Sequence, residues 1–424
     1  MSLRGKKLEY KWVVLVVCFL MEFICLGFGS STGGLYTVAV TDALHINRTV
    51  YSLSGSIRYI TQVVVALFFG TFVNRLGTKK MVCIGLCSML GCTLLKACAT
   101  NVYHFYIAGA MLGLGMIFVG GTMASTILRR WFAQDVGRYT GIVMSANGIG
   151  GAIASQIVSP IINNGEVFGY RKSYLLSTLI ILSISIVIVI FLKDRPAEGP
   201  VINTLPGKKQ PKGNVWAGLE YTEIKKKPYF YLSALLVFLT GISLQSIGSI
   251  SIVYMSDLGM SAGFIATTST VACIVLTFGK ILVGRNFDKK GLRFALLMCQ
   301  GAAIIAFFLK GIMTGSTLGM VFAMAATILA TLAQPIETVM IPLLTADMFG
   351  SASYAKVLGV FTAMNSLGLC LGTPLGNASF DVFGSYKPSF WLFFVLMVVV
   401  TISFQLVLNA AYKDKQRIME SVQQ

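Results

Sequence analysis

Charged residues are scarce in this 424-residue chain, and histidine is almost absent. Asp, Glu, Lys and Arg make up 12% of the sequence, and there are two histidines, whereas a soluble domain carries about a quarter charged residues. The nine cysteines form no CxxC pair and no cluster with histidine or carboxylates, so we expect neither a metal nor a cofactor. The sequence contains no nucleophile and base pair and no phosphate-binding loop, and we therefore expect that the protein is not an enzyme.

Long hydrophobic runs take the place of charge. Hydrophobic residues make up 55% of the chain, and segments such as KWVVLVVCFLMEFICLGFG reach the roughly 20 residues needed to span a bilayer core. Hydrocarbon leaves the backbone no external hydrogen-bond partner, so these segments should be helices. The first run is too long for the core of a cleavable signal peptide. We predict an all-α membrane protein of twelve transmembrane helices, beginning near Trp12, Val50, Lys79, Tyr103, Arg138, Ser173, Tyr229, Ser261, Arg293, Thr317, Ala355 and Ser389.

The basic residues are unevenly placed between the predicted helices. The net charge of +18 could indicate nucleic-acid binding, but most Lys and Arg residues fall in the loops on one side of the predicted membrane. Only six of the 34 fall in the loops on the other side: Arg48, Lys96, Arg171, Lys172, Lys310 and Lys387. This is the positive-inside bias of membrane proteins. We therefore expect a multi-pass protein of the cell (inner) membrane with both termini in the cytoplasm, the lipid bilayer and not nucleic acid as its partner, and a monomeric state.

The longest polar stretch divides the twelve segments into two sets of six. It runs from Lys193 to Pro228 and is rich in proline and lysine, a composition typical of a linker. We predict an N-terminal six-helix bundle over residues 1–192, a cytoplasmic linker over 193–228 and a C-terminal six-helix bundle over 229–424.

One loop motif occurs in both halves. GTFVNRLGTKK follows the second segment and GRNFDKKGLR follows the eighth. The matching residues are each 214 positions apart: Gly70 and Gly284, Asn74 and Asp288, Arg75 and Lys289, Gly77 and Gly291, Lys79 and Arg293. A second echo joins segments 5 and 11, where Asn147 follows Gly141 by six residues and Asn365 follows Gly359 by six. Such a repeat predicts two pseudo-symmetric bundles with a site between them, as in secondary transporters.

The repeated loop resembles the signature loop of the major facilitator superfamily. The resemblance implies a transporter in which two six-helix bundles rearrange around a central site. FVNRLGTKK and LRRWFAQDVGRYTGIVMSANGIGG look like the monocarboxylate porter branch and are similar to the bacterial oxalate:formate antiporters. This implies transport of a small organic anion, a mono- or dicarboxylate, by exchange or by symport with protons.

The branch resemblance also assigns a position to Lys280. The family uses an Arg on helix 8, one turn before the second signature loop, and Lys280 stands there in this sequence. Leu276 replaces the acidic residue that eukaryotic monocarboxylate porters carry one turn earlier, and Asn365 replaces the helix 11 lysine of the oxalate antiporter. Antiport, proton symport and facilitated diffusion of the anion all remain open.

Four ionisable residues fall inside predicted membrane segments. A charge there costs roughly 2.5–3.5 kcal/mol on insertion scales and marks a candidate functional site. Lys280 is the strongest candidate for binding an anion, with snorkelling to the surface as the alternative. Arg58 and Glu22 lie on adjacent segments, where Arg58 could bind the anion while Glu22 neutralises the site or carries a proton; a structural ion pair is the alternative. For Glu337, gating or packing is favoured over substrate contact.

Three neutral polar residues complete the predicted site. Asn147, Asn365 and Gln245 lie in segments 5, 11 and 7, where they could hydrogen-bond the cargo or join helices to one another. A related facilitator with another cargo is the competing hypothesis, and that cargo could be an amphipathic acid such as a bile acid, a drug or a sugar.

Overall fold

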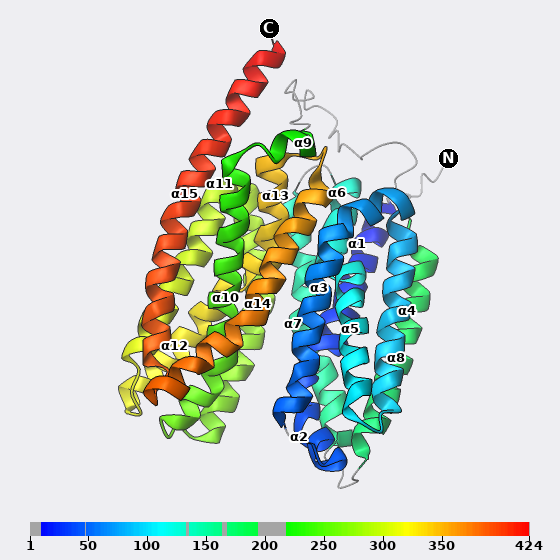
Figure 1. Cartoon of the computed structure of the whole chain (residues 1–424), viewed down its shortest axis with the longest axis vertical. Coiled ribbons are helices and arrows are strands. Elements are labelled where there is room, and N and C mark those ends of the chain that lie inside the picture. Colours follow the sequence, from blue (N-terminus) through cyan, green and yellow to red (C-terminus); the bar gives the residue numbers. More distant parts are fainter. Residues whose placement is uncertain (1–9, 47, 133–134, 163–167, 194–217, 424) are drawn as a thin grey trace, which may run out of the picture.

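A computed structural model describes residues 10–46, 48–132, 135–162, 168–193 and 218–423 of the protein (Figure 1). Within these ranges the chain is helical and contains no strand. Most of the predicted Lys193–Pro228 linker lies outside the described residues.

The helices divide between the first and second halves of the chain. The first half contains α1 (Tyr10–Glu22), the π-helical segment η1 (Phe23–Ser31), α2 (Gly33–Leu44), α3 (Arg48–Leu76), α4 (Thr78–Ala97), α5 (Val102–Val119), α6 (Gly121–Trp131), α7 (Val136–Ile162) and α8 (Gly169–Phe191). The second half contains α9 (Tyr221–Ile224), α10 (Pro228–Asp257), α11 (Ala262–Ile312), α12 (Thr317–Ala333), the π-helical segment η2 (Ile336–Met340), α13 (Ile341–Phe349), α14 (Tyr354–Phe383) and α15 (Lys387–Gln423).

Twelve membrane spans are present in the described part of the chain. Eleven stretches are long and apolar enough to cross a membrane, and one of them, Gly263–Ile312, has 50 residues. This stretch is broken at Gly291, whose φ of 81° lies in the left-handed region that favours glycine. Its two parts are separate spans, which brings the number to the predicted twelve. Gly77 in the first signature loop has a φ of 78°, so the two loops turn in the same way.

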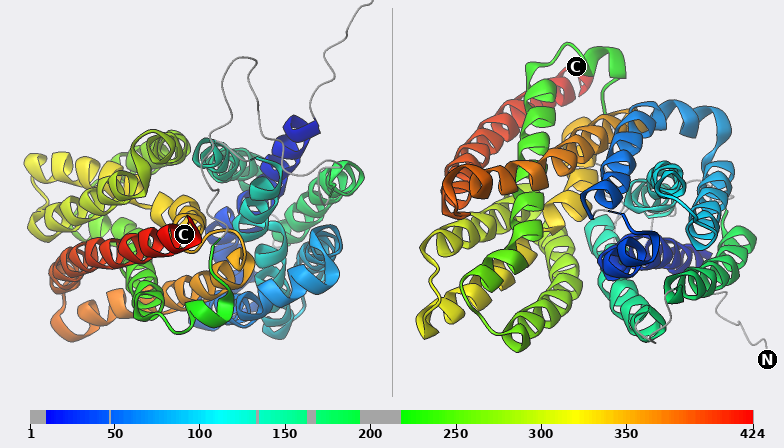
Figure 2. Two further views of the ribbon diagram at one scale, coloured as in Figure 1. Left: turned by 90° about the horizontal axis from the view of Figure 1, so that it is seen from above. Right: turned by 60° about the horizontal axis from the view of Figure 1, so that its bottom comes forward.

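The spans form two groups that stand side by side (Figures 1 and 2). Helices α1 to α8 lie in one group and α10 to α15 in the other, and α15 ends at the same end of the molecule at which α1 begins. Outward-facing side chains in both groups are large and apolar. On α8, Leu179 and Ile190 are 60% and 64% exposed, and on α15 Leu392 and Leu406 are 64% and 63% exposed. Such faces are suited to lipid and not to water.

Glycine pairs bring equivalent helices into contact in each half. In the first half, a Cβ added to Gly27 of η1 would lie 2.6 Å from the carbonyl carbon of Gly150 on α7. In the second half, a Cβ added to Gly241 of α10 would lie 3.4 Å from Cα of Gly368 on α14. Gly27 and Gly241 are 214 positions apart, the offset of the signature loops. The internal repeat therefore extends from the loops to the packing of the helices.

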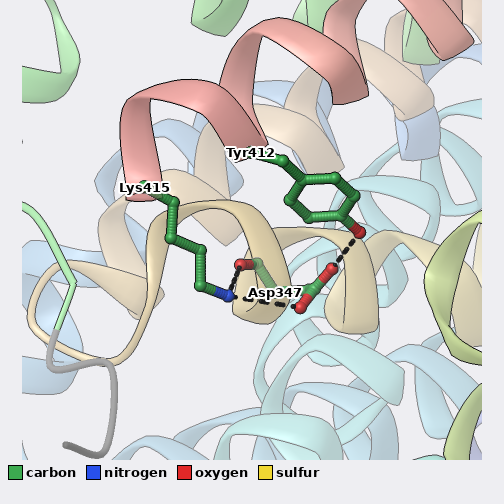
Figure 3. Close-up of polar contacts among 3 residues, drawn as sticks. All are labelled: Asp347, Tyr412 and Lys415. Carbon is green, nitrogen blue, oxygen red and sulfur yellow. Dashed lines mark hydrogen bonds and ion pairs between the residues drawn. The ribbon is translucent and has the colours of Figure 1, made fainter. Parts of the chain in front are cut away.

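Polar contacts tie the end of α15 to neighbouring helices (Figure 3). The Tyr412 hydroxyl donates to Asp347 Oδ2 on α13 at 2.5 Å, and Lys415 Nζ lies 3.6 Å from Asp347 Oδ1. Asp414 Oδ2 lies 2.7 Å from Lys227 Nζ, just before α10. These contacts hold three helices of the second half together at the end where the C-terminus lies.

Lys310 corrects one expectation from the charge pattern. It was assigned to an external loop, but it lies inside the second half at 1% exposure, where Nζ donates to Ser251 Oγ and lies 5.8 Å from the centre of the Phe390 ring. Lys96 is 5.6 Å from the centre of the Tyr174 ring at the matching place in the first half. A hydroxyl acceptor and an aromatic face stabilise an ammonium group away from water, which a count of loop charges does not detect.

Candidate functional site

A cavity of about 920 Å³ lies between the two halves. Its walls come from α1, η1, α3, α5, α6 and α7 of the first half and from α10, α11, η2, α13 and α14 of the second. Ligand pockets in proteins span about 300–1,000 Å³, so the cavity is large enough for a small molecule. Within the described ranges, no group of three or more His, Cys, Asp or Glu side chains is placed to hold a metal ion.

The structure brings all of the membrane-embedded polar residues selected from the sequence to this one cavity. They come from seven different segments: Glu22, Arg58, Asn147, Gln245, Lys280, Glu337 and Asn365. The structure places these residues around one cavity. Their roles in binding or coupling stay predictions.

Lys280 connects the two halves. It is 1% exposed, and its Nζ donates to the backbone oxygen of Met144 on α7 at 3.0 Å. The contact is close because Gly141, one turn earlier on α7, lies directly against the backbone of Lys280. An ammonium group has three N–H donors, and no other hydrogen bond from Lys280 is found among the described residues. The group therefore has capacity for a further acceptor.

Two carboxylates face this ammonium group electrostatically, one from each half. They belong to Glu22 and Glu337, and both act on the charge of Lys280. Each lies at a π-helical segment: Glu22 directly precedes η1, and Glu337 lies within η2, after Pro335. Such segments are common at functional sites. Both carboxylate oxygens of Glu22 and one of Glu337 are buried without a hydrogen-bond partner among the described residues, so the site holds unmet acceptors.

Arg58 is held by neighbours other than Glu22. Its Nη1 donates to Ser30 Oγ at 2.8 Å, and its guanidinium lies 4.4 Å from the centre of the Tyr59 ring. Its Nε has no partner in the described part of the chain. The hypothesis that Glu22 pairs with Arg58 therefore concerns a conformation other than this one.

The three neutral residues have different surroundings. Asn147 Oδ1 accepts a hydrogen bond from Ser31 Oγ at 3.3 Å, and Gln245 Nε2 donates to Thr373 Oγ1 at 3.2 Å. Asn365 Oδ1 is buried and has no partner among the described residues. Of the three, Asn365 has the strongest unmet requirement for a hydrogen bond.

Contacts between the halves gather at the end where α1 begins. Asp288 of the second signature loop accepts hydrogen bonds from the backbone N–H groups of Gly137 (3.0 Å) and Arg138 (2.6 Å) at the start of α7. A second contact joins α6 to α14, where the guanidinium of Arg129 lies 4.4 Å from the centre of the Tyr354 ring. These contacts hold the two halves together at that end.

Gly70 of the first signature loop is part of the same set of contacts. A Cβ added there would lie 2.7 Å from Cα of Lys356 on α14. Asn74 lines a smaller space of about 250 Å³ beside Arg129 and Lys356. The two signature loops thus lie at the contacts between the halves, and Asp288 is the member that caps a helix of the opposite half.

Several cavity residues were not predicted from the sequence. Gln62 Oε1 accepts from Ser366 Oγ across the two halves at 3.4 Å, and Thr122 and Thr362 join the halves with hydroxyl oxygens 3.4 Å apart. The usable signal is helical spacing, since Gln62 lies four residues after Arg58 and therefore on the same face of α3. Uncharged residues in apolar segments are too common for this signal to be used without a charged neighbour.

Comparison with known proteins places these features in a wider context. A family model described as Major Facilitator Superfamily matches residues 18–373. The sialic acid transporter NanX of Escherichia coli is 23% identical over 58% of this chain and 58% of its own length, so the chain spans little more than half of this relative. Multidrug resistance protein 2 of Bacillus subtilis is 21% identical over 84% of this chain and 86% of its own length. Monocarboxylate transporter 1 of Rattus norvegicus is 21% identical over 92% of this chain and 82% of its own length.

The fold is shared with solved transporter structures. The proton:xylose symporter XylE, solved with 6-bromo-6-deoxy-D-glucose bound, superposes with a TM-score of 0.69 over 93% of this chain and 95% of that one, at 12% identity. At this identity the likeness establishes the arrangement of the helices alone.

Proposed function

The chain belongs to the Major Facilitator Superfamily, and from this premise we propose that it is a secondary active transporter that moves a small organic anion, a mono- or dicarboxylate, across the membrane. The observation that carries the proposal is the placement of Lys280 and Arg58 on one cavity between the two halves. Both groups retain N–H donors without partners in the described part of the chain. A carboxylate supplies the acceptors and the negative charge that such donors require in a water-poor site.

Alternating access is the mechanism we propose. In the present conformation, Lys280 bonds Met144 of the opposite half while Asp288 and Arg129 contact the opposite half nearer one end. Opening that end requires these contacts to break. An anion bound to Lys280 would become a second partner of an ammonium group that already bonds the opposite half, so cargo binding and rearrangement of the halves become linked.

The coupling of transport has two forms that the site supports. In a symporter, a proton carried on Glu22 accompanies the anion, because a buried carboxylate without a hydrogen-bond partner is a suitable proton acceptor. In an exchanger, the halves rearrange only while an anion is bound to Lys280. One anion therefore leaves the site only when another takes its place. The relatives include proteins named for sialic acid, monocarboxylates and multidrug resistance, so a drug, a sugar or an amphipathic acid is the alternative cargo.

Counterflow in proteoliposomes tests the proposal. Vesicles that contain the purified protein are loaded with unlabelled short mono- and dicarboxylates and diluted into the radiolabelled compounds. We expect transient accumulation of at least one labelled carboxylate, which an imposed proton gradient enhances for a symporter and leaves unchanged for an exchanger. Accumulation of a neutral sugar or a cationic drug, with none of any carboxylate, would refute an organic anion as the cargo.

We also propose that both termini face the cytoplasm of a cell membrane and that one chain is the working unit, since a single chain supplies the whole cavity. Single cysteines in a cysteine-free background test the orientation. A cysteine at Lys226, before α10, should react with an impermeant reagent only after the cells are opened. A cysteine at Thr100, between α4 and α5 at the other end, should react in intact cells; the reverse pattern would invert the proposed topology.

A further inference from the structure

The cavity wall is rich in hydroxyl and amide groups. Besides the charged residues, thirteen of its lining side chains carry such a group, among them Gln62, Asn147, Gln245, Gln334, Thr338 and Thr362. A cavity for a short aliphatic acid needs a cationic group for the carboxylate and apolar wall for the rest. The wall of this cavity has more hydroxyl and amide groups than a carboxylate alone can bond.

Several residues that line the cavity also carry acceptor atoms that are buried without a partner and have almost no accessible surface in this conformation. Within the described ranges, Glu22 Oε1 and Oε2, Glu337 Oε1 and Asn365 Oδ1 are buried without a hydrogen-bond partner, and so is Thr338 Oγ1. A buried acceptor without a donor is costly. An aliphatic carboxylate offers acceptors only, so it would satisfy Lys280 and Arg58 and leave these atoms unpaired. A hydroxyl group on the cargo is a donor as well as an acceptor.

Charge and size narrow the class further. Two basic side chains, Arg58 and Lys280, and two acidic ones, Glu22 and Glu337, line the cavity, and Lys280 interacts electrostatically with both carboxylates. The cargo therefore does not need an ammonium group of its own to balance the charge of the two carboxylates. The volume of about 920 Å³ corresponds to about 30 water molecules at their liquid volume, which is space enough for a cargo of sugar size.

We propose that the cargo is a polyhydroxylated carboxylate of about six or more carbons, the class of the sugar acids. Its carboxylate binds at Lys280 and Arg58, and its hydroxyl groups donate to Asn365 and to the acidic side chains of Glu22 and Glu337. This inference rests on the proposed function, because it takes an organic anion as the cargo and specifies which one.

Four compounds with six carbons separate the contributions. D-Gluconate has a carboxylate and hydroxyl groups, hexanoate has the carboxylate alone, D-glucose has hydroxyl groups without a carboxylate, and 6-aminohexanoate pairs the carboxylate with an ammonium group. Binding of each to the purified full-length protein is measured by isothermal titration calorimetry. We expect D-gluconate to bind at least about tenfold more tightly than each of the others, since two added hydrogen bonds of ordinary strength produce a change of about that size.

A variant links the preference to the wall. Asn365→Leu should reduce the ratio of D-gluconate to hexanoate affinity by about fivefold while hexanoate binding is kept, and Lys280→Ala should weaken both acids together. Gln405→Leu on α15 is the matched control, because it also replaces an amide but lies outside the cavity. It should leave the ratio unchanged, and equal melting temperatures of the three variants show that each is folded.

The outcomes distinguish this inference from the function on which it rests. Hexanoate binding as tightly as D-gluconate would overturn the hydroxylated cargo and leave organic anion transport standing. If 6-aminohexanoate binds most tightly of the four compounds, the cargo is a zwitterion and not a hydroxylated carboxylate. If D-glucose and D-gluconate bind equally and hexanoate does not bind, the carboxylate is not recognised. The proposed function would then fail together with this inference.

Discussion

Lys280 is a buried cationic side chain at the contact between the two halves. It donates one hydrogen bond to the backbone of the opposite half, and it interacts electrostatically with Glu22 and Glu337. Helix packing alone would not favour such a residue, because a leucine would fill the same space without the cost of burying a charge. At the residue scale, we propose that Lys280 stands here because it binds the transported anion.

Replacing Lys280 should separate charge from geometry. Lys280→Ala removes a charge-assisted hydrogen bond worth about 1.5–3 kcal/mol, so we expect the affinity for the anion to fall by roughly tenfold to a hundredfold. Lys280→Arg keeps the charge and should retain part of the activity. Counterflow of the transported anion gives the comparison, and size-exclusion chromatography of the purified variants checks that they are folded. Wild-type exchange by Lys280→Ala would transfer the anion site to Arg58.

The relation between Glu22 and Arg58 is a second question at this scale. Arg58 bonds Ser30 in the present conformation, and Glu22 has no hydrogen-bond partner among the described residues. If the two side chains pair when the halves rearrange, the losses of transport caused by Glu22→Gln and Arg58→Gln should not add, and their coupling should exceed about 0.5 kcal/mol. Additive losses in the double variant would show that they act independently.

At the scale of helices and loops, the two signature loops differ in one functional group. Asp288 accepts from two backbone N–H groups at the start of α7, where a negative charge is stabilised by the helix dipole. Asn74 has the equivalent place in the first loop and carries no charge. We therefore expect the loop of the second half to hold this end more strongly than the loop of the first half.

Removing this charge should weaken the contacts at this end. Asp288→Asn keeps the shape of the side chain but loses an interaction with the helix start worth about 0.3–1 kcal/mol, so we expect up to about a fivefold shift toward the state opened at that end. The accessibility of a cysteine placed at Thr126, in the smaller space between the halves, reports the shift. Asn74→Asp is the opposite change and should reduce that accessibility; no response to either change would show that the loops do not hold this end.

At the scale of the whole molecule, two bundles share one cavity and meet at one end of it. The cavity belongs to neither half alone, since its cations and carboxylates are divided between them. A rocking motion therefore changes the site and the access route together, which is the requirement for transport without a continuous pore.

Locking the halves should stop transport without damage to either bundle. The hydroxyl oxygens of Thr122 and Thr362 are 3.4 Å apart across the interface, and the pair Thr122→Cys and Thr362→Cys, in a background without the native cysteines, should form a disulfide under oxidation. We expect oxidation to abolish counterflow and reduction to restore it. The two single cysteine variants are the controls. Undiminished counterflow by the fully cross-linked protein would contradict alternating access at this interface.

The sequence by itself determined the membrane class, the twelve spans and the internal repeat. These features depend on local properties: the length of apolar segments, and the backbone angles that glycine permits in the loops at Gly77 and Gly291. The cost of a charge in hydrocarbon is also local, which is why Lys280, Arg58, Glu22 and Glu337 could be selected before any contact was known.

Only the tertiary structure decided how these residues lie with respect to one another. The rotation of each helix about its axis depends on packing against segments that are distant in the sequence, and glycine contacts such as Gly141 against Lys280 set it. This packing brings Glu337 to the cavity, buries Lys310 in the second half and points Arg58 at Ser30. The period of a helix tells which residues share a face, but it does not tell which neighbour that face meets.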